Sequence, residues 1–212
     1  MSTDRFDRHE YLHGTLDRED LDADPFAQFR KWYEDARTAG HLDPSAMSLA
    51  TVSATGAPHA RMVLLKSLDE RGFIFCTHRT SVKGQDIAQN PNVAMVFYWP
   101  KIERQVRIEG VAQFLSAEEN AEFYLSRPRG AQIAASLGHQ SEPVADHETL
   151  ERLYEEAVKR FEGKDVTPLE TWGAYAVTPS AIEFWQGGEN RLHDRFRYTC
   201  QKDGWQIDRL MP

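Results

Sequence analysis

The stretch Trp185-Gln186-Gly187-Gly188-Glu189-Asn190-Arg191-Leu192-His193-Asp194-Arg195 is the most informative part of this 212-residue chain. Two glycines interrupt a strand pattern, and Arg191, His193 and Arg195 follow at alternate positions. Alternate residues of a strand face the same side, so these three side chains are expected to share one face. Two guanidiniums and an imidazole repel one another unless an anion lies on that face. A solvated edge strand is the alternative, although Trp185 and a glycine pair are unusual on a plain edge.

Further motifs occur one after another over almost the whole chain. They are RMVLLK at residues 61–66, ERQV at 103–106, SRPR at 126–129, Gln140-Ser141 and DRLMP at 208–212. Together with WQGGENRLHDR they resemble the pyridoxamine 5′-phosphate oxidase family, whose members use FMN to make pyridoxal 5′-phosphate. The resemblance runs from about Arg8 to Pro212, and several ordered motifs are far more specific than any one of them.

Composition restricts the class of protein. The chain is 41% hydrophobic, which suits one globular domain with a full core. The polar, charged N-terminal residues and the absence of an apolar run of membrane-spanning length predict a cytoplasmic protein with no signal peptide and no membrane contact. Cys76 and Cys200 are far apart, which fits a reducing compartment, and the eight histidines form no metal-binding motif. A net charge of −8 argues against nucleic acid as a partner.

Periodicity and turn signals predict an α+β chain of mostly antiparallel strands interrupted by helices. Helices are expected from Asp24 to Gly40, at 81–89, from Ser116 to about Pro128, at 131–137 and from Asp146 to Gly163. Strands are expected at 47–54, 58–68, 73–77, 92–99, 102–115, 172–177, 182–185, 193–200 and 205–210. Residues 1–20 are expected to be mobile and 21–212 to form a single domain. The family resemblance sharpens this fold to an FMN-binding split β-barrel with flanking helices.

The resemblance implies a flavin site drawn from several elements. Lys83 lies near a helix N-terminus, where backbone amides and the helix dipole favour a phosphate. The family has an Arg-Lys pair there, whereas this chain has Val82-Lys83, and Cys76 stands where a tyrosine is familiar. By local pattern alone, Gln105 is a solvated strand residue and Trp185 a core residue. The cofactor-binding residues implied are Arg61, Met62, Val63, Leu64, Leu65, Lys66, Cys76, Thr77, Val82, Lys83, Gln105, Gln140, Ser141, Trp185 and Arg195.

The resemblance also implies a substrate site, with a phosphate held by Lys66 and Arg127. The family typically adds a tyrosine and a serine hydroxyl, whereas this chain has Phe123 and Ala131 at those positions. Tyr124 would supply a replacement hydroxyl if the helix were rotated, and Ser126 is less well placed. The substrate-binding residues implied are Lys66, Phe123, Arg127, Ala131, Arg191, Leu192 and His193, and the catalytic ones are Arg191, His193 and Asp43. Residues 8–11 resemble a segment that covers the site or binds product.

Three of these residues have other interpretations. Arg61 and Lys66 lie five apart in a predicted strand, so a regular strand would point them to opposite sides unless a bulge or twist intervenes. In the alternative interpretation, Arg61 and Lys66 are both charges at the rim of an interface. Arg127 precedes a proline after a helix, where an arginine commonly satisfies the last carbonyl groups.

The activity implied is oxidation of pyridoxamine or pyridoxine 5′-phosphate by FMN in a homodimer with its sites at the subunit interface. A hydride leaves C4′ of the substrate, water hydrolyses the imine formed from the amine, and O2 is reduced to H2O2. Two alternatives remain open at this stage. One is a split-barrel flavin oxidoreductase acting on a different anionic substrate, and the other is a non-catalytic flavin- or pyridoxal-phosphate-binding protein.

Overall fold

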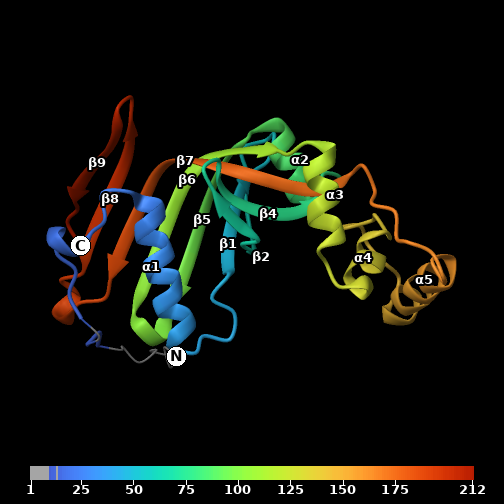
Figure 1. The fold of residues 1–212 in the computed structure, drawn as a ribbon, viewed down its shortest axis with the longest axis horizontal. Coiled ribbons are helices and arrows are strands. Elements are labelled where there is room, and N and C mark those ends of the chain that lie inside the picture. The colour runs from blue at the N-terminus through green and yellow to red at the C-terminus, as the bar shows by residue number, and fades with distance from the viewer. Residues whose placement is uncertain (1–9, 13) are drawn as a thin grey trace, which may run out of the picture. The chain divides into compact units, whose positions relative to one another are not determined.

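Helices and strands are interspersed along the chain (Figure 1). The computed structural model describes residues 10–12 and 14–212. The α-helices of that part are α1 (Pro25–Thr38), α2 (Val82–Gln89), α3 (Ala117–Leu125), α4 (Arg129–Ala135) and α5 (His147–Arg160). Its short 3-10 helices are η1 (Arg18–Asp20), η2 (Pro100–Ile102) and η3 (Glu189–Arg191). The predicted mobility of residues 1–20 falls in part on residues outside the described ranges and stays a prediction, as does the single domain at 21–212.

One nine-stranded sheet carries the fold. Its strands are β1 (Ala46–Val52), β2 (Pro58–Leu64), β3 (Ser67–Asp69), β4 (Gly72–His78), β5 (Asn92–Trp99), β6 (Arg104–Phe114), β7 (Trp172–Gln186), β8 (Asp194–Gln201) and β9 (Gly204–Arg209). Seven of them follow the order β2-β1-β5-β6-β7-β4-β3, and β8 pairs with both β7 and β9. The β3–β4, β4–β7, β7–β8 and β8–β9 pairs are antiparallel.

The chain forms two compact units that each combine separate segments. The first unit is Met1–Met47, Met95–Glu109 and Ser180–Pro212. Its helix α1 begins as predicted, because the Asp24 carboxylate accepts hydrogen bonds from the backbone N–H groups of the first turn. The apolar face of α1 buries Phe29 and Trp32, whose rings lie 5.0 Å from Phe97 and 5.1 Å from Phe184. These edge-to-face aromatic contacts form the core of this unit.

The second unit comprises Ser48–Ala94 and Gly110–Pro179. Its helix α2 is capped by Ser81, whose hydroxyl accepts a hydrogen bond from the Gly84 N–H. A Cβ at Gly84 would lie 2.5 Å from the carbonyl oxygens of His78 and Arg79, so only glycine allows this close approach. The helix is thereby held against the end of β4, and this contact places Lys83 and Asp86 next to the sheet.

The predicted strand at 58–68 is wrong in its extent. Strand β2 ends at Leu64, and β3 begins at Ser67. The intervening Lys66 donates its backbone N–H to the carbonyl of Ile74 at 2.7 Å, which ties the break to β4. Arg61 and Lys66 therefore do not belong to one regular strand, and the conflict between their predicted directions disappears.

The C-terminal strands also differ from their prediction. Strand β7 is continuous where two segments were expected, and β8 begins only at Asp194. Arg191 lies in η3, where Asn190 and Arg191 have left-handed φ angles of 54° and 66°. The shared strand face expected for Arg191, His193 and Arg195 is therefore wrong, because only Arg195 belongs to a strand.

Candidate active site

A cavity of about 660 Å³ in the second unit gathers most of the predicted site residues. The predicted residues that line it are Arg61, Met62, Val63, Leu64, Lys66, Cys76, Thr77, Lys83, Phe123, Arg127, Ala131 and Gln140. Among the described residues that line this cavity, four have cationic side chains and none is acidic. Such an unbalanced wall attracts a small anion, because like charges at short range repel until a counter-charge arrives.

Lys83 is the most deeply buried cation of the cavity. Its ammonium donates to Thr77 Oγ1 at 3.2 Å, Gln140 Oε1 at 3.1 Å and Ser81 Oγ at 3.4 Å. No carboxylate of the described residues lies within ion-pair distance of it. Burial, together with the charge of Arg61, lowers the pKa of Lys83. An ammonium held by neutral oxygens alone leaves its charge available to an anionic ligand.

Arg61 reaches the same cavity from β2. Its Nη1 donates to the Leu49 carbonyl at 3.1 Å and to Thr51 Oγ1 at 2.8 Å, and its Nη2 lies 3.8 Å from Asp86 Oδ2. Burial lowers the pKa of Arg61, and the charge of Asp86 opposes this effect. The guanidinium is thus held in a fixed pose by backbone and side-chain acceptors.

Arg127 forms a second cationic position in the cavity. Its guanidinium lies 4.8 Å from the ring centre of Trp172, and its Nη1 is buried without a hydrogen-bond partner among the described residues. Buried polar groups of native proteins are normally paired, so this donor indicates a ligand atom or a water. In the alternative interpretation Arg127 caps the last carbonyl groups of its own helix. Among the described residues, its side chain donates no hydrogen bond to such a carbonyl.

Cys76 lies beside Arg127 in a desolvated setting. Burial raises the pKa of this thiol to about 11, although the charges of Lys66 and Arg127 oppose the shift. Cys76 therefore remains a neutral thiol at physiological pH, and it contributes shape to the cavity without a charge.

The wall formed by α3 and α4 has apolar side chains at the two positions where the family typically has hydroxyl groups. Phe123 and Ala131 line the cavity, whereas Tyr124 is fully buried and donates its hydroxyl to the Gln132 carbonyl at 2.7 Å. The expectation that Tyr124 replaces a missing hydroxyl is therefore wrong. Ser126 lines the cavity, but its hydroxyl donates to the Phe123 carbonyl at 2.9 Å.

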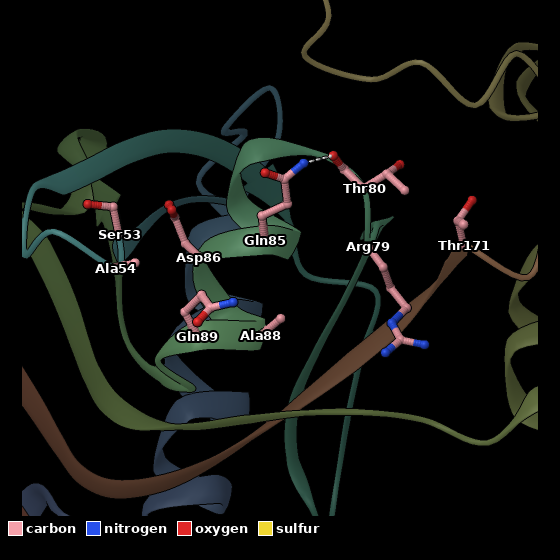
Figure 2. Close-up of a pocket in the computed structure, with 9 residues that line it drawn as sticks. All are labelled: Ser53, Ala54, Arg79, Thr80, Gln85, Asp86, Ala88, Gln89 and Thr171. Atoms are coloured by element: carbon pink, nitrogen blue, oxygen red, sulfur yellow. Dashed lines mark hydrogen bonds between the residues drawn. The ribbon is translucent and has the colours of Figure 1, made fainter.

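A second cavity of about 760 Å³ lies in the same unit and is drawn in Figure 2. Polar side chains dominate its wall, among them Gln85, which donates to the Thr80 carbonyl at 2.8 Å. Arg79 is the one cation among its described lining residues, and this guanidinium lies 4.8 Å from the ring centre of Phe114. This cavity lacks the cluster of uncompensated cations that marks the first.

The remaining predicted residues fall into two groups. Leu65, Val82 and Ser141 belong to the second unit without lining the 660 Å³ cavity, although the Val82 N–H lies 3.4 Å from Ser141 Oγ. The first unit holds the others, namely Asp43, Gln105, Trp185, Arg191, Leu192, His193 and Arg195. The predicted site is thus divided between the two units.

Within the first unit, the C-terminal residues form a cluster of their own. His193 Nδ1 accepts a hydrogen bond from the Gly188 N–H at 3.1 Å, and its ring lies 4.7 Å from that of Trp185. Burial, with the charges of Arg191 and Arg195, lowers the pKa of His193, so the neutral ring carries its proton on Nε2. Arg195 donates to Glu183 Oε1 at 2.8 Å, and Leu192 is exposed.

Some site residues were missed or lie apart from this cluster. Trp172 lines the 660 Å³ cavity, and its only signal in the sequence is an aromatic residue at a strand start. Tyr11 lies edge-on to Trp185 and His193, each ring centre 5.4 Å away. Arg8, predicted in the same segment, lies outside the described residues. Asp43 is exposed and accepts hydrogen bonds from the backbone and hydroxyl of Ser45, as in an ordinary turn.

Two family models and several curated relatives match this chain. The family model described as pyridoxamine 5′-phosphate oxidase matches residues 33–161, and one described as the pyridoxine 5′-phosphate oxidase C-terminal dimerisation region matches residues 172–212. A pyridoxine/pyridoxamine 5′-phosphate oxidase of Rubrobacter xylanophilus is 48% identical, over 97% of this chain and 94% of that protein. The Vibrio cholerae protein of the same name is 46% identical, over 97% of each chain.

Solved structures show the same fold. A pyridoxamine 5′-phosphate oxidase-related, FMN-binding protein of Nostoc punctiforme has a TM-score of 0.72 at 15% identity, over 89% of this chain and 98% of the other. PhzG of Burkholderia lata, solved with tetrahydrophenazine-1-carboxylic acid, has a TM-score of 0.86 at 30% identity, over 92% and 95%. The predicted class, an α+β split barrel of the FMN-binding type, is confirmed.

The chain belongs to the pyridoxamine 5′-phosphate oxidase family. Membership places it among the oxidoreductases, and the match to a dimerisation region at residues 172–212 supports a homodimer. None of the helices described is both long and apolar enough to cross a membrane.

Proposed function

We propose that this protein oxidises pyridoxamine 5′-phosphate or pyridoxine 5′-phosphate to pyridoxal 5′-phosphate, with FMN as cofactor and O2 as acceptor. The observation that carries the proposal is the 660 Å³ cavity with its unbalanced cations, because cofactor and substrate both bear a phosphate. The curated relatives at 46–48% identity bear the name of this activity.

The residues of the cavity fit two phosphates at two positions. Lys83 and Arg61 belong to one position, with Thr77 and Gln140 as neutral partners, and we assign it to the FMN phosphate. Arg127 belongs to the other, where its unpartnered Nη1 suits a substrate phosphate oxygen. Charge-assisted hydrogen bonds of this kind are about twice as strong as neutral ones.

The protein's own part in the reaction is binding and orientation. When bound, FMN supplies the hydride acceptor and the reaction with O2 that yields H2O2. Arg127 and Lys66 would hold the substrate phosphate. Arg191 and His193 would contact the rest of the substrate, with Arg191 over its reacting carbon. The neutral His193 offers an Nε2 proton to a substrate oxygen without adding positive charge. Holding the partners in line is a major part of the rate gain in such reactions.

A homodimer would complete each site. The predicted residues are divided between two units of the chain, and residues 172–212 match a dimerisation region. We propose that each FMN contacts both subunits.

Anaerobic reduction tests the proposed activity. The purified protein should be yellow, and its visible flavin absorbance should disappear when either vitamer phosphate is added without oxygen. Admission of air should restore the colour and release H2O2, together with ammonia in the case of the amine. A yellow protein that neither vitamer bleaches would contradict the assignment of substrate while leaving the cofactor in place.

The apolar side chains of Phe123 and Ala131 at the substrate-phosphate position lead to a prediction about substrate affinity. Phe123→Tyr and Ala131→Ser each add a hydroxyl at a residue that lines the cavity. A new hydrogen bond to phosphate contributes about 1–2 kcal/mol, so each variant should lower the substrate Kd roughly 5- to 30-fold. Rapid mixing without oxygen measures this change, because the dependence of the flavin-reduction rate on substrate concentration gives the Kd.

Tyr124→Phe is the matched control for these variants. The Tyr124 hydroxyl is buried against the Gln132 carbonyl, so its removal should reduce stability and leave the substrate Kd unchanged. If neither added hydroxyl alters the Kd, the substrate phosphate lies elsewhere and the assignment of Arg127 is wrong.

One observation favours a different substrate for the same chemistry. PhzG, at 30% identity, was solved with a carboxylic acid of a reduced phenazine, and this chain lacks two hydroxyls at the proposed phosphate position. The second candidate function is therefore FMN-dependent oxidation of another anionic ring compound. Bleaching by a reduced aromatic carboxylate, with no response to the vitamer phosphates, would favour it.

A further inference from the structure

A buried carboxylate lies directly behind the proposed cofactor-phosphate position. Asp86 on α2 is 6% exposed, and its Oδ2 accepts hydrogen bonds from Thr51 Oγ1 at 2.6 Å and His59 Nδ1 at 2.9 Å. The same oxygen lies 3.8 Å from Arg61 Nη2. Figure 2 shows Asp86 among the side chains at the wall of the second cavity. Arg61 lines the first cavity, so this carboxylate contacts the guanidinium from outside the proposed site.

Asp86 contributes order to this region. Thr51 Oγ1 donates to Asp86 and accepts a hydrogen bond from Arg61 Nη1, so the carboxylate fixes the hydroxyl that in turn holds the guanidinium. Burial opposes ionisation of Asp86, but the hydrogen bonds from Thr51 and His59 and the nearby charges hold its pKa below the ordinary value. Asp86 is therefore an anion under physiological conditions.

An anion in this place also has a cost for binding a phosphate. Among the described lining residues, Arg61 and Lys83 are the cations assigned to the proposed cofactor-phosphate position, and Val82 adds no charge. One negative charge on Asp86 offsets part of their attraction for a phosphate at short range. His59 is the neighbouring group that draws part of this negative charge away from Arg61, because its Nδ1 donates a hydrogen bond to Asp86 Oδ2 while its side chain remains 40% exposed.

We propose that His59 and Asp86 form a positioning pair for the cofactor phosphate, in which the His59 imidazole holds the Asp86 carboxylate by a hydrogen bond and Asp86 orders Thr51 and Arg61. The geometry of β2 supports this, because His59 and Arg61 are two residues apart and point to the same, less exposed side of the strand. The inference rests on the proposed function, since it takes the phosphate at Lys83 and Arg61 to be that of FMN.

A comparison of two ligands isolates the phosphate. FMN and riboflavin share the ring system and differ by the phosphate, and each can be titrated into the flavin-free dimer by fluorescence. The wild-type protein should bind FMN much more tightly than riboflavin. Equal affinities would contradict the proposed cofactor-phosphate position itself, which separates that failure from a failure of the present inference.

Replacing the pair tests its two roles. His59→Ala removes the hydrogen-bond donor to Asp86, so the FMN Kd should rise roughly 3- to 10-fold with the riboflavin Kd unchanged. His59→Gln, which retains a hydrogen-bond donor, should stay within about twofold of the wild type. Asp86→Asn in the His59→Ala background should restore FMN affinity, because the uncompensated negative charge is then gone while an acceptor for Thr51 remains.

The control and the contrary results are equally defined. His147→Ala removes the imidazole of an exposed pair on α5, 3.2 Å from Glu151, and should change neither Kd. The proposal is overturned if His59→Ala leaves FMN affinity unchanged, if riboflavin is weakened as much as FMN, or if Asp86→Asn fails to restore binding. The last two results would assign the pair to packing of β2 against α2.

Discussion

Arg191→Ala should reduce turnover by about 100-fold or more while the FMN Kd changes by less than about threefold. Arg191 is exposed and makes no ion pair or hydrogen bond with any described residue, so its guanidinium is available to a substrate. Its backbone is left-handed, with a φ of 66°, a conformation that is uncommon for a residue with a side chain. Strained residues of this kind persist where the surrounding structure imposes them, often at ligand sites.

Steady-state kinetics and flavin titration separate the two effects for Arg191. Arg191→Lys should recover part of the turnover, because it restores a charge without the planar fork of the guanidinium. Arg152→Ala is the matched control, since Arg152 is an exposed arginine paired with Glu156 on α5 and should affect neither measurement. A colourless Arg191→Ala protein whose activity returns with excess FMN would instead assign Arg191 to the cofactor.

The elements predicted correctly are those whose ends depend on local chemistry. Asp24 and Ser116 cap α1 and α3, and Asp146 caps α5, each through a side chain that accepts from the backbone of the first turn. In α3 the capping box with Glu119 is present as expected. Such signals depend on a few neighbouring residues, so a single sequence suffices to read them.

The errors concern features that depend on distant partners. The break between β2 and β3 is set by the hydrogen bond from Lys66 to Ile74 of a neighbouring strand, which no local pattern reveals. Tyr124 points away from the cavity because the side on which a short helix packs decides its rotation, and here the Tyr124 ring packs on Trp172 with the ring centres 5.1 Å apart. The turn at Asn190 and Arg191 replaced the expected strand because two residues adopt left-handed backbone.

The site residues show the same division. Lys83 and Arg127 could be named from the family resemblance, but only the structure shows that neither has a carboxylate partner among the described residues. The contact of Arg127 with Trp172 joins residues 45 positions apart. The bond between His59 and Asp86 likewise links a strand to a helix. Spacing in the sequence carries no information about such pairs.

Lys83→Ala should have the second large effect, this time on the cofactor. The Lys83 ammonium is buried among neutral oxygens, and hydrogen bonds to charged groups contribute about 1.5–3 kcal/mol. Loss of this group should raise the FMN Kd roughly 10- to 150-fold, because Val82 offers no second cation next to it. Turnover at saturating FMN should stay within about threefold of the wild type, since Lys83 is assigned to the cofactor and not to the substrate.

Thermal unfolding provides an independent measurement on the Lys83→Ala protein. A buried ammonium without a carboxylate partner is costly to desolvate, so the flavin-free variant should melt at or above the temperature of the flavin-free wild type. The rise in melting temperature caused by a fixed FMN concentration should shrink in the variant, because ligand stabilisation depends on the ratio of that concentration to Kd. Lys202→Ala, at an exposed lysine of the β8–β9 hairpin, should alter neither quantity. If Lys83→Ala instead unfolds the flavin-free protein and leaves FMN affinity intact, Lys83 serves the fold through Thr77 and Gln140, and the cofactor phosphate is held elsewhere.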